Sequence, residues 1–521
     1  MFYNPLKSKC IRIIIVLDIL LEKSIRRGSV KYFVGIDLGT SALKLLLVDS
    51  YGEIVKTVSR TYSVQYPKSG WSEQNPEDWW QSLLSGVKEL IENTDVSKIV
   101  GMGIGGQMHG LVVLDKNDKV IRPAILWNDG RTDKETEYLN EVVGKTKLSE
   151  LTANIAFAGF TAPKLLWLKN NEPENFSKIS KVMLPKDYIN YRLTGVHSTD
   201  YSDASGMLLL DVKNKGWSKE MLSICEINES QMPTLFESFE TIGTLVPDIA
   251  SEMGLNASIK VVAGAGDNAA AAIGTGTVAK GKCNISLGTS GTVFISSDKF
   301  SVDNNNALHS FCHANGEYHL MACILSAASC NKWFCEDILC TNNYKKEESY
   351  ITDDDLGRND VFFLPYLMGE RSPINDTDAR GTFIGMHMDT KRKNMLLAVL
   401  EGVAFAIRDN FEIVKEQGIR IDCCSLCGGG AKSALWQKIL SNVLNIDIAL
   451  LQTEQGPGYG AAMLAMVGCG EFSSVKECAN TLVKQKNTVT PDTEISARYE
   501  MQYNKYKEIY PAVKNLFKKI K

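Results

Sequence analysis

The sequence lacks three features: a long hydrophobic run, an excess of charge of one sign, and a regular cysteine framework. Its 57 Lys and Arg residues against 61 Asp and Glu give a net charge of −4, which provides no electrostatic basis for binding nucleic acid. No apolar run approaches the ~18 residues of a membrane-spanning helix, so we expect no membrane association. The 13 cysteines are scattered and odd in number, which is unlike a secreted disulfide framework and favours reduced thiols in the cytoplasm.

The composition is that of a globular protein. Hydrophobic residues make up 44% of the chain and charged residues 23%, which excludes a disordered, fibrous or collagen-like chain. A length of 521 residues predicts about three domains, or two large ones. Predicted strands alternate with helices, such as an amphipathic helix over 75–93, and this alternation indicates the α/β class.

The first thirty residues are set apart from the rest of the sequence. The apolar stretch 11–21 is interrupted by Asp18 and is followed by no small-residue cleavage site, so a signal peptide is not favoured. Residues 26–28 (RRG) can be encoded by a ribosome-binding sequence, and a GTG codon for Val30 is a usable start. Residues 1–30 are therefore predicted to be a non-native or disordered extension, which an N-terminal mass measurement on the native protein would test.

One short motif occurs twice. Residues 36–41 (IDLGTS) recur as residues 285–290 (ISLGTS), each after a β-prone run and before another, which predicts a strand, a Gly-Thr-Ser turn and a second strand. In such a turn, glycine lets the backbone approach a ligand, and the N–H groups and hydroxyls can hold phosphate oxygens. The spacing predicts two homologous domains, 31–277 and 278–521, whose turns clamp one polyphosphate.

A third glycine cluster, 428–430, lies between the apolar-leaning run 421–427 and the helix-like stretch 434–444. Strand, glycines and helix in this order are typical of a backbone that passes against a nucleotide. Neither the P-loop nor the dinucleotide signature fits. Cys283 stands where the P-loop requires Ser or Thr for magnesium, and 103–106 lacks the required glycine spacing.

Two aspartates are candidates for phosphoryl transfer, which needs a magnesium carboxylate, a phosphate cradle and a group that deprotonates the attacking hydroxyl. Asp37 ends the first predicted strand at the mouth of its turn, whereas the repeat copy has Ser286 there. Asp267 lies between a predicted strand and an alanine-rich helix, where it can cap the helix and act on a substrate. The alternatives are a turn residue bonded to its own backbone for Asp37, and a plain N-cap for Asp267.

His109 lies in the segment GQMHG just past a predicted strand, where Gln, His and backbone groups can bind sugar hydroxyls. A turn histidine bonded only to backbone is the alternative. The segment 309–313 (HSFCH) has no second ligand pair at zinc spacing, and neither do Cys423, Cys424 and Cys427, so we predict no zinc site. We expect these cysteines to lie in a packed strand, and a redox role for them is left open.

Together these motifs resemble the FGGY family of carbohydrate kinases. The matching segments are 35–41, 71–74, 106–110, 125–131, 159–167, 184–188, 286–291, 309–313, 364–366, 381–385 and 400–402. They follow in order from Tyr32 to Phe517, which is far more specific than a single motif, and the stretch before Tyr32 has no counterpart. Within the family, the pattern is most similar to members that phosphorylate D-xylulose.

The resemblance implies two actin-like, ribonuclease-H-like domains with the active-site cleft between them. It implies that the γ-phosphoryl group of ATP passes to the 5-hydroxyl of D-xylulose, with Mg²⁺ as cofactor, to give D-xylulose 5-phosphate and ADP. By motif match, Asp267 would take the hydroxyl proton, and Asp37 would hold Mg²⁺ directly or through water. The other implied contacts are Gln107, Met108, His109 and Asn268 to the sugar, and Gly39, Thr40, Ser41, Lys44, Gly288, Thr289, Ser290, Gly428, Gly429 and Gly430 to ATP.

Three alternatives remain at this point. The same fold can act on another sugar or polyol, such as ribulose, gluconate or glycerol. An actin-like or chaperone-like ATPase would share the repeated turns but would need neither Asp267 nor the segment at His109, and its ATP turnover would ignore sugars. A catalytically silent sugar-binding relative is disfavoured because Asp37 and Asp267 are both present. The expected partners are a small-molecule sugar and ATP, and a homodimer is left open.

Overall fold

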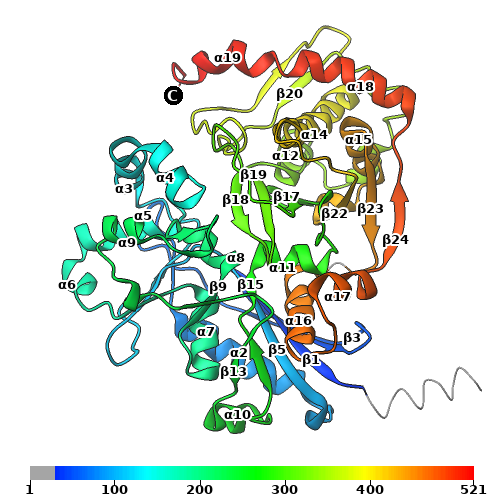
Figure 1. The fold of residues 1–521 in the computed structure, drawn as a ribbon. Coiled ribbons are helices and arrows are strands. Elements are labelled where there is room, and N and C mark those ends of the chain that lie inside the picture. The colour runs from blue at the N-terminus through cyan, green and yellow to red at the C-terminus, as the bar shows by residue number, and fades with distance from the viewer. Residues whose placement is uncertain (1–29, 454, 521) are drawn as a thin grey trace, which may run out of the picture.

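The computed structural model describes residues 30–453 and 455–520. Its two halves are lobes built on two seven-stranded sheets, with α11 and α16 between them (Figure 1). The α/β prediction is confirmed. The predicted N-terminal extension, apart from Val30, lies outside the described residues.

The first sheet has the strand order β13-β14-β5-β1-β2-β3, with β15 also paired to β5. Strand β1 is antiparallel to β2 and parallel to β5, and it is buried along most of its length because both faces of the sheet are covered. The bounds are β1 Tyr32–Leu38, β2 Ala42–Asp49, β3 Ile54–Thr61, β5 Ile99–Gly106, β13 Thr241–Thr244, β14 Lys260–Val262 and β15 Ala265–Gly266.

Helix α2 (Pro76–Leu90) lies where the periodicity predicts a helix, and it is shorter than the predicted range at both ends. The Asn75 side chain accepts a hydrogen bond from the Glu77 N–H group at 3.1 Å and caps the first turn. The remaining elements of this half are β4 Glu73–Gln74, β6 Val112–Leu114, β7 Ala124–Ile125, α3 Asp133–Glu137, α4 Lys145–Thr152, α5 Thr161–Asn171, α6 Pro173–Phe176, β8 Lys181–Met183, α7 Pro185–Thr194, β9 Ser198–Asp200, α8 Tyr201–Ala204, β10 Leu210–Asp211, β11 Gly216–Trp217, α9 Lys219–Ile224, β12 Thr234–Phe236 and α10 Pro247–Met253.

The second sheet repeats the arrangement of the first. Strand β16 is antiparallel to β17 and parallel to β22, as β1 is to β2 and β5, so the repeated motif forms the same hairpin in both lobes. Its strands, in spatial order, are β18 His309–Cys312, β19 Tyr318–Ile324, β17 Gly291–Ser297, β16 Lys282–Leu287, β22 Cys423–Cys427, β23 Asp447–Leu451 and β24 Gln485–Val489. The other elements are α12 Ala328–Trp333, α13 Tyr344–Glu348, β20 Phe362–Leu364, β21 Thr382–Ile384, α14 Arg392–Glu416, α15 Ala434–Leu444, α17 Val475–Leu482, α18 Thr493–Tyr506 and α19 Ile509–Phe517.

Helix α16 (Gly456–Gly468) joins the two halves. It precedes β24 in the chain but packs against β1 and β5 of the first sheet and against α11 (Asp267–Gly274). The approach is close, because a Cβ atom added to Gly35 would lie 2.0 Å from the Gly458 carbonyl oxygen. Its Met463 belongs to the same buried cluster as Phe33 of β1. The predicted domain boundary between 277 and 278 stays a prediction.

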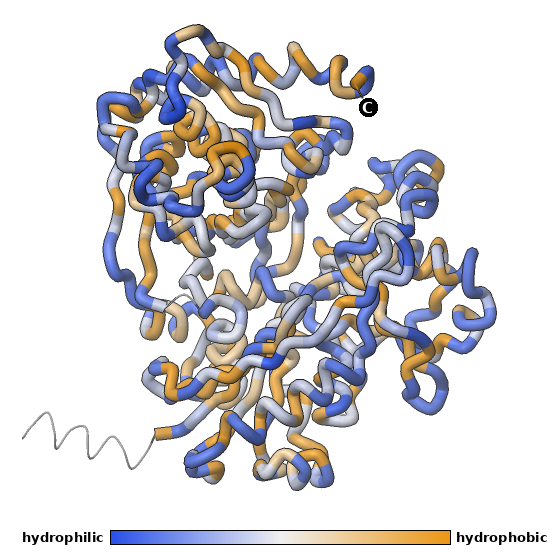
Figure 2. The backbone as a smooth tube through the Cα atoms, turned by 180° about the vertical axis from the view of Figure 1, so that it is seen from behind, coloured by the Kyte–Doolittle hydropathy of each residue, from blue (hydrophilic) through white to orange (hydrophobic). Residues whose placement is uncertain are grey.

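In the view from behind, hydrophilic residues gather in the peripheral loops, while the strands between them are mostly hydrophobic or neutral (Figure 2). No helix within residues 30–453 and 455–520 is long and apolar enough to cross a membrane.

The close contact between α11 and α16 should be important for the stability of the fold. A Cβ atom on Gly460 would lie 1.8 Å from the Ala270 carbonyl oxygen, so Gly460→Ala must push the two helices apart. We expect it to lower the free energy of unfolding by about 1–3 kcal/mol, the usual cost of overpacking. Gly216→Ala is the matched control, because nothing lies within 4 Å of its Cβ position. Urea denaturation of both variants measures the effect, and equal midpoints would contradict it.

Candidate active site

Asp37 and the first Gly-Thr-Ser turn lie at one end of β1. Asp37 pairs with Lys44 across the β1–β2 hairpin, and the Gly39 N–H group donates to the Ala42 carbonyl at 3.0 Å to close the turn. The Lys44 ammonium donates to Gln455 Oε1 at 2.8 Å, at the start of α16. Burial raises the pKa of Asp37 to about 6, and the Lys44 charge opposes that rise.

A polar network links this turn to the segment after β5. Thr40 Oγ1 donates to Gln107 Oε1 at 3.2 Å and accepts from Trp127 Nε1 at 2.9 Å. The Gln107 amide donates to Gln74 Oε1 at 3.2 Å, and the Gln107 N–H group donates to the Leu38 carbonyl at 2.9 Å. Gln107 is buried. Gln107 therefore supports the first Gly-Thr-Ser turn through its hydrogen bonds with Thr40 and Leu38. Its contact with the sugar stays a prediction.

Asp267, Asn268 and Met108 meet at the start of α11. Asp267 is the first residue of the helix, and its Oδ1 accepts from the Asn268 backbone N–H at 2.7 Å and side-chain amide at 2.9 Å. The same amide lies 4.0 Å from Met108 Sδ. Gly266 keeps this junction narrow, since a Cβ there would lie 2.9 Å from the Met108 side chain. Three of the predicted sugar-site residues are thus in contact.

His109 occupies the left-handed backbone region, with φ of 68°. Its Nδ1 lies 2.7 Å from the Gly206 carbonyl, and its ring stacks on Phe160 with centroids 4.6 Å apart. Burial lowers its pKa to about 3, so the ring is neutral at pH 7. Because a carbonyl can only accept, Nδ1 is the donor, and Nε2 is left as an acceptor for a ligand hydroxyl.

The two candidate aspartates act on each other although they are far apart in sequence. Burial raises the pKa of Asp267 to about 7, and the negative charge of Asp37 adds to that rise, while the two hydrogen bonds from Asn268 oppose it. The charge of Asp37 therefore acts on the Asp267 carboxyl group across the site.

The carboxylate pair fits a magnesium ion. No group of three or more His, Cys, Asp or Glu side chains suited to a metal occurs within the described part of the chain. Mg²⁺, however, is commonly held by one or two carboxylates together with water and substrate phosphates. Burial raises the pKa of both carboxyl groups, and the charge of Asp37 adds to the rise at Asp267, so such a cation would stabilise both in their charged form.

The second Gly-Thr-Ser turn and the glycine cluster lie together in the other lobe. Gly428 has φ of 91° and passes so close to β16 that a Cβ atom would lie 2.6 Å from the Leu287 carbonyl. Gly288, Thr289, Gly429 and Gly430 line a cavity of about 1210 Å³, and Ser290 is exposed beside it. A neighbouring cavity of about 620 Å³ is lined by Asp267, Asn268 and Gly428. Lys432 borders both cavities, so the nucleotide-type turns adjoin the Asp267 side of the cleft.

Of the three cysteines of β22, only Cys424 is packed as the sequence predicts; Cys423 and Cys427 are half-buried, and Cys427 lines the cavity that also contains Asp267. Cys424 is fully buried, and burial raises the pKa of its thiol well above the ordinary range. Burial also raises the pKa of Cys423. Because the thiolate is the reactive form, these raised pKa values disfavour oxidation at either residue.

Two residues beside the His109 segment, Lys164 and Arg371, were not predicted as site residues from the sequence. Lys164, buried at the start of α5, donates to the His109 carbonyl at 2.9 Å and to the Gly159 carbonyl at 2.6 Å, and so holds the His109 backbone. Arg371, from the other lobe, places its guanidinium 5.0 Å from the Phe157 ring, and its charge helps to lower the pKa of His109. Lys164 lies in the matched segment 159–167, but no spacing in the sequence singles out Arg371.

Comparison with known proteins identifies the family. Residues 32–274 match the N-terminal domain of the FGGY family of carbohydrate kinases, and residues 283–469 match its C-terminal domain. The chain belongs to the FGGY family of carbohydrate kinases. As a member of this family, it uses ATP to phosphorylate a carbohydrate.

This FGGY kinase is similar along nearly its whole length to curated xylulose kinases. It is 39% identical to the xylulose kinase of Escherichia coli over 480 residues, covering 92% of this chain and 98% of the relative. It is 38% identical to that of Bacillus subtilis over 489 residues, covering 93% and 98%. A crystal structure titled a "xyloylose kinase" from Brucella ovis superposes with a TM-score of 0.89 at 38% identity, covering 93% of this chain and 100% of that one.

Proposed function

We propose that this kinase transfers the γ-phosphoryl group of ATP to the 5-hydroxyl of D-xylulose. The observation that carries the proposal is the junction where Asp267, Asn268 and Met108 meet and where the charge of Asp37 acts on Asp267. The identity of 38–39% to xylulose kinases over more than nine-tenths of the chain supports the choice of sugar. Because ATP is an intracellular metabolite, the proposal includes a cytoplasmic location.

In this proposal, Asp267 orients the attacking hydroxyl and accepts its proton. The alcohol has a far higher pKa than the carboxyl group, so the proton moves late, as the bond to phosphorus forms. Asn268 and neutral His109 bind other hydroxyls of the sugar, His109 through Nε2 as an acceptor. Met108 supplies an apolar wall.

The phosphates would lie between the two lobes. Backbone N–H groups and hydroxyls of 39–41 would contact them from one side and those of 288–290 from the other, and Lys44 would add a positive charge. Residues 428–430 would flank the adenosine. Asp37 would hold Mg²⁺, directly or through water, and Mg²⁺ bound there would neutralise negative charge on the phosphates.

The test is ADP release from magnesium-ATP in the presence of D-xylulose, D-ribulose, L-ribulose, gluconate or glycerol, with a no-sugar control. We expect D-xylulose to stimulate release most strongly, and mass spectrometry of the product to show a 5-phosphate. Stronger stimulation by another acceptor would keep the kinase chemistry and overturn the choice of sugar. Release that is equal with and without every sugar would overturn the proposal in favour of an ATPase.

A further inference from the structure

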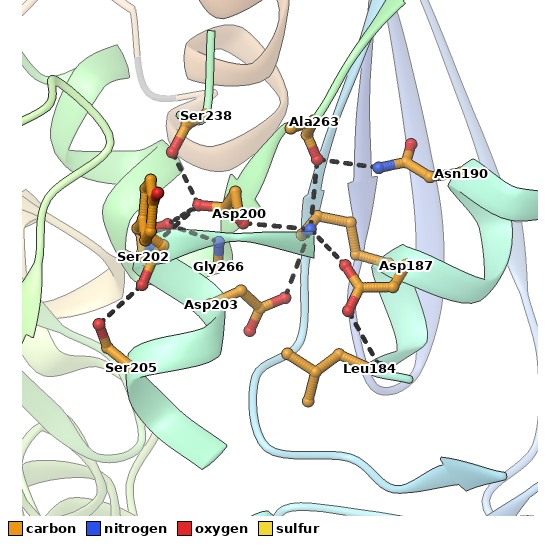
Figure 3. A network of polar contacts seen from close by, with 12 residues as sticks. Leu184, Asp187, Asn190, Asp200, Ser202, Asp203, Ser205, Ser238, Ala263 and Gly266 are labelled. Carbon is orange, nitrogen blue, oxygen red and sulfur yellow. Dashed lines mark hydrogen bonds and ion pairs between the residues drawn. The ribbon is translucent and has the colours of Figure 1, made fainter. Parts of the chain in front are cut away.

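A buried ionic cluster lies against Ala263 and Gly266, in the segment that immediately precedes Asp267 (Figure 3). Lys186, at the start of α7, has its ammonium 2.7 Å from Asp187, 3.1 Å from Asp200 and 3.8 Å from Asp203. All four side chains are fully buried. A buried cation that faces three carboxylates contributes little to the stability of the fold, because desolvation of the charges offsets much of their attraction. This suggests a role for the cluster other than stability.

The cluster forms hydrogen bonds with the chain segment that leads to Asp267. The Lys186 ammonium donates to the Ala263 carbonyl at 3.2 Å, and Asn190 donates to the same oxygen at 2.8 Å. Farther along, the Gly266 N–H group donates to Ser202 Oγ at 3.2 Å. Residues 263–266 are therefore held at both ends, and the next residue is the proposed base.

Ser202 connects the two ends through Asp200. Asp200 Oδ2 accepts from Ser202 Oγ at 2.5 Å and from Ser238 Oγ at 2.7 Å, while its other oxygen faces Lys186 (Figure 3). Because the Ser202 hydroxyl hydrogen is given to Asp200, its lone pairs are aimed at Gly266. The position of the Gly266 backbone thus depends, through Ser202, on the buried ion pair between Asp200 and Lys186.

The third carboxylate, that of Asp203, also interacts electrostatically with the proposed base, Asp267. Within the described part of the chain, neither oxygen of Asp203 has a hydrogen-bond donor. Burial raises the pKa of Asp203 well above its usual range, and the charges of Asp187, Asp200 and Asp267 add to that rise. Asp203 is therefore linked to both Lys186 and Asp267 through charge, from a position 3.8 Å from the Lys186 ammonium.

We propose that Lys186 and Ser202 are positioning residues that fix residues 263–266 and so set where the Asp267 carboxylate meets the sugar hydroxyl. The inference rests on the proposed function of Asp267 as the base. A small displacement of a reacting group is costly, since an error of about 1 Å can lower the rate by about 10²-fold. Loss of this support should therefore slow the chemical step more than it weakens sugar binding.

The two serines on Asp200 offer a matched pair for the test. Ser202→Ala removes a hydroxyl that bonds both Asp200 and Gly266, whereas Ser238→Ala removes a hydroxyl that bonds only Asp200. We expect Ser202→Ala to lower kcat by about 10- to 100-fold with the sugar KM within about twofold of the wild type. Ser238→Ala should keep kcat within about twofold, and urea denaturation should give both variants similar midpoints.

Equal kcat values for the two variants, or a change that falls mainly on the sugar KM, would overturn the positioning role. Lys186→Met should lower kcat further, but it leaves buried carboxylates uncompensated and can unfold the protein, so the serine pair decides the outcome. Asp267→Asn in the same series separates the two proposals. If Asp267→Asn is inactive while the serine variants are equal, only the positioning role fails; if Asp267→Asn turns over normally, the base assignment fails as well.

Discussion

Asp267→Asn is expected to lower kcat by at least ~10²–10⁴, the usual contribution of a general base. The substitution keeps an oxygen that can accept both hydrogen bonds from Asn268, so the start of α11 should stay folded. An amide cannot take the proton of the attacking hydroxyl, so the loss should fall on kcat. Asp267→Ala should be at least as impaired, because it also leaves the Asn268 donors without their partner.

The control for this substitution is Asp78→Asn. Asp78 also lies in the first turn of a helix, α2, but it is exposed and lines neither of the two cavities at the site. Its variant should keep kcat within about twofold of the wild type. Steady-state ADP release with saturating D-xylulose measures all three variants. Turnover of Asp267→Asn close to that of Asp78→Asn would refute the base assignment.

The same base predicts the pH dependence of the wild-type enzyme. Burial and the charge of Asp37 raise the pKa of Asp267 to about 7, and only the ionised carboxylate can accept a proton. The value of kcat/KM for the sugar should therefore fall about tenfold per pH unit on the acid side of the Asp267 pKa and level off above it, and because bound Mg²⁺ favours the charged carboxylate, this fall should begin below pH 7 when Mg²⁺ is saturating. A profile that is flat down to pH 5 would show that no group with this pKa acts as the base. The measurement needs constant ionic strength, because screening changes the repulsion between the two carboxylates.

The hairpins and the first helix could be predicted because local interactions decide them. The strand, Gly-Thr-Ser turn and strand at 36–48 close through bonds between neighbours, such as Gly39 to Ala42. Helix α2 has its own cap at Asn75 and its own apolar stripe. The repetition at 285–290 then predicted a second lobe built on the same plan, and the second sheet confirms it.

The long-range contacts at the site could not be predicted in this way. Nothing within 456–468 shows that this helix packs on β1, because the contact depends on a glycine at Gly35, more than 400 residues earlier. Lys186 was visible only as part of a matched segment, since a Lys-Asp pair in sequence is usually solvated. Its burial follows from three aspartates that the fold assembles around it.

Asp37→Asn should raise the Mg²⁺ concentration needed for half-maximal activity by about 10- to 100-fold, a range typical when a group that supports a metal is removed. The variant keeps the size of the side chain and loses its negative charge, so the hairpin between β1 and β2 should persist. Magnesium titrations of ADP release at fixed ATP measure the shift. Asp78→Asn again serves as the control, and an unchanged midpoint in Asp37→Asn would contradict the magnesium role.

The Asp37→Asn variant should also change the pKa of Asp267, which we expect to decrease. In the wild-type protein without Mg²⁺, the charge of Asp37 contributes to the raised pKa of Asp267, so its removal should lower that pKa. The titration of Asp267 in the magnesium-free protein, followed by NMR of its carboxyl group, should then move to lower pH. A variant that lost activity only by misfolding would show a smaller folded fraction with an unmoved titration midpoint. If Asp37→Asn both weakens magnesium affinity and lowers the pKa of Asp267, the two aspartates interact electrostatically within one site. Neither measurement by itself would establish that.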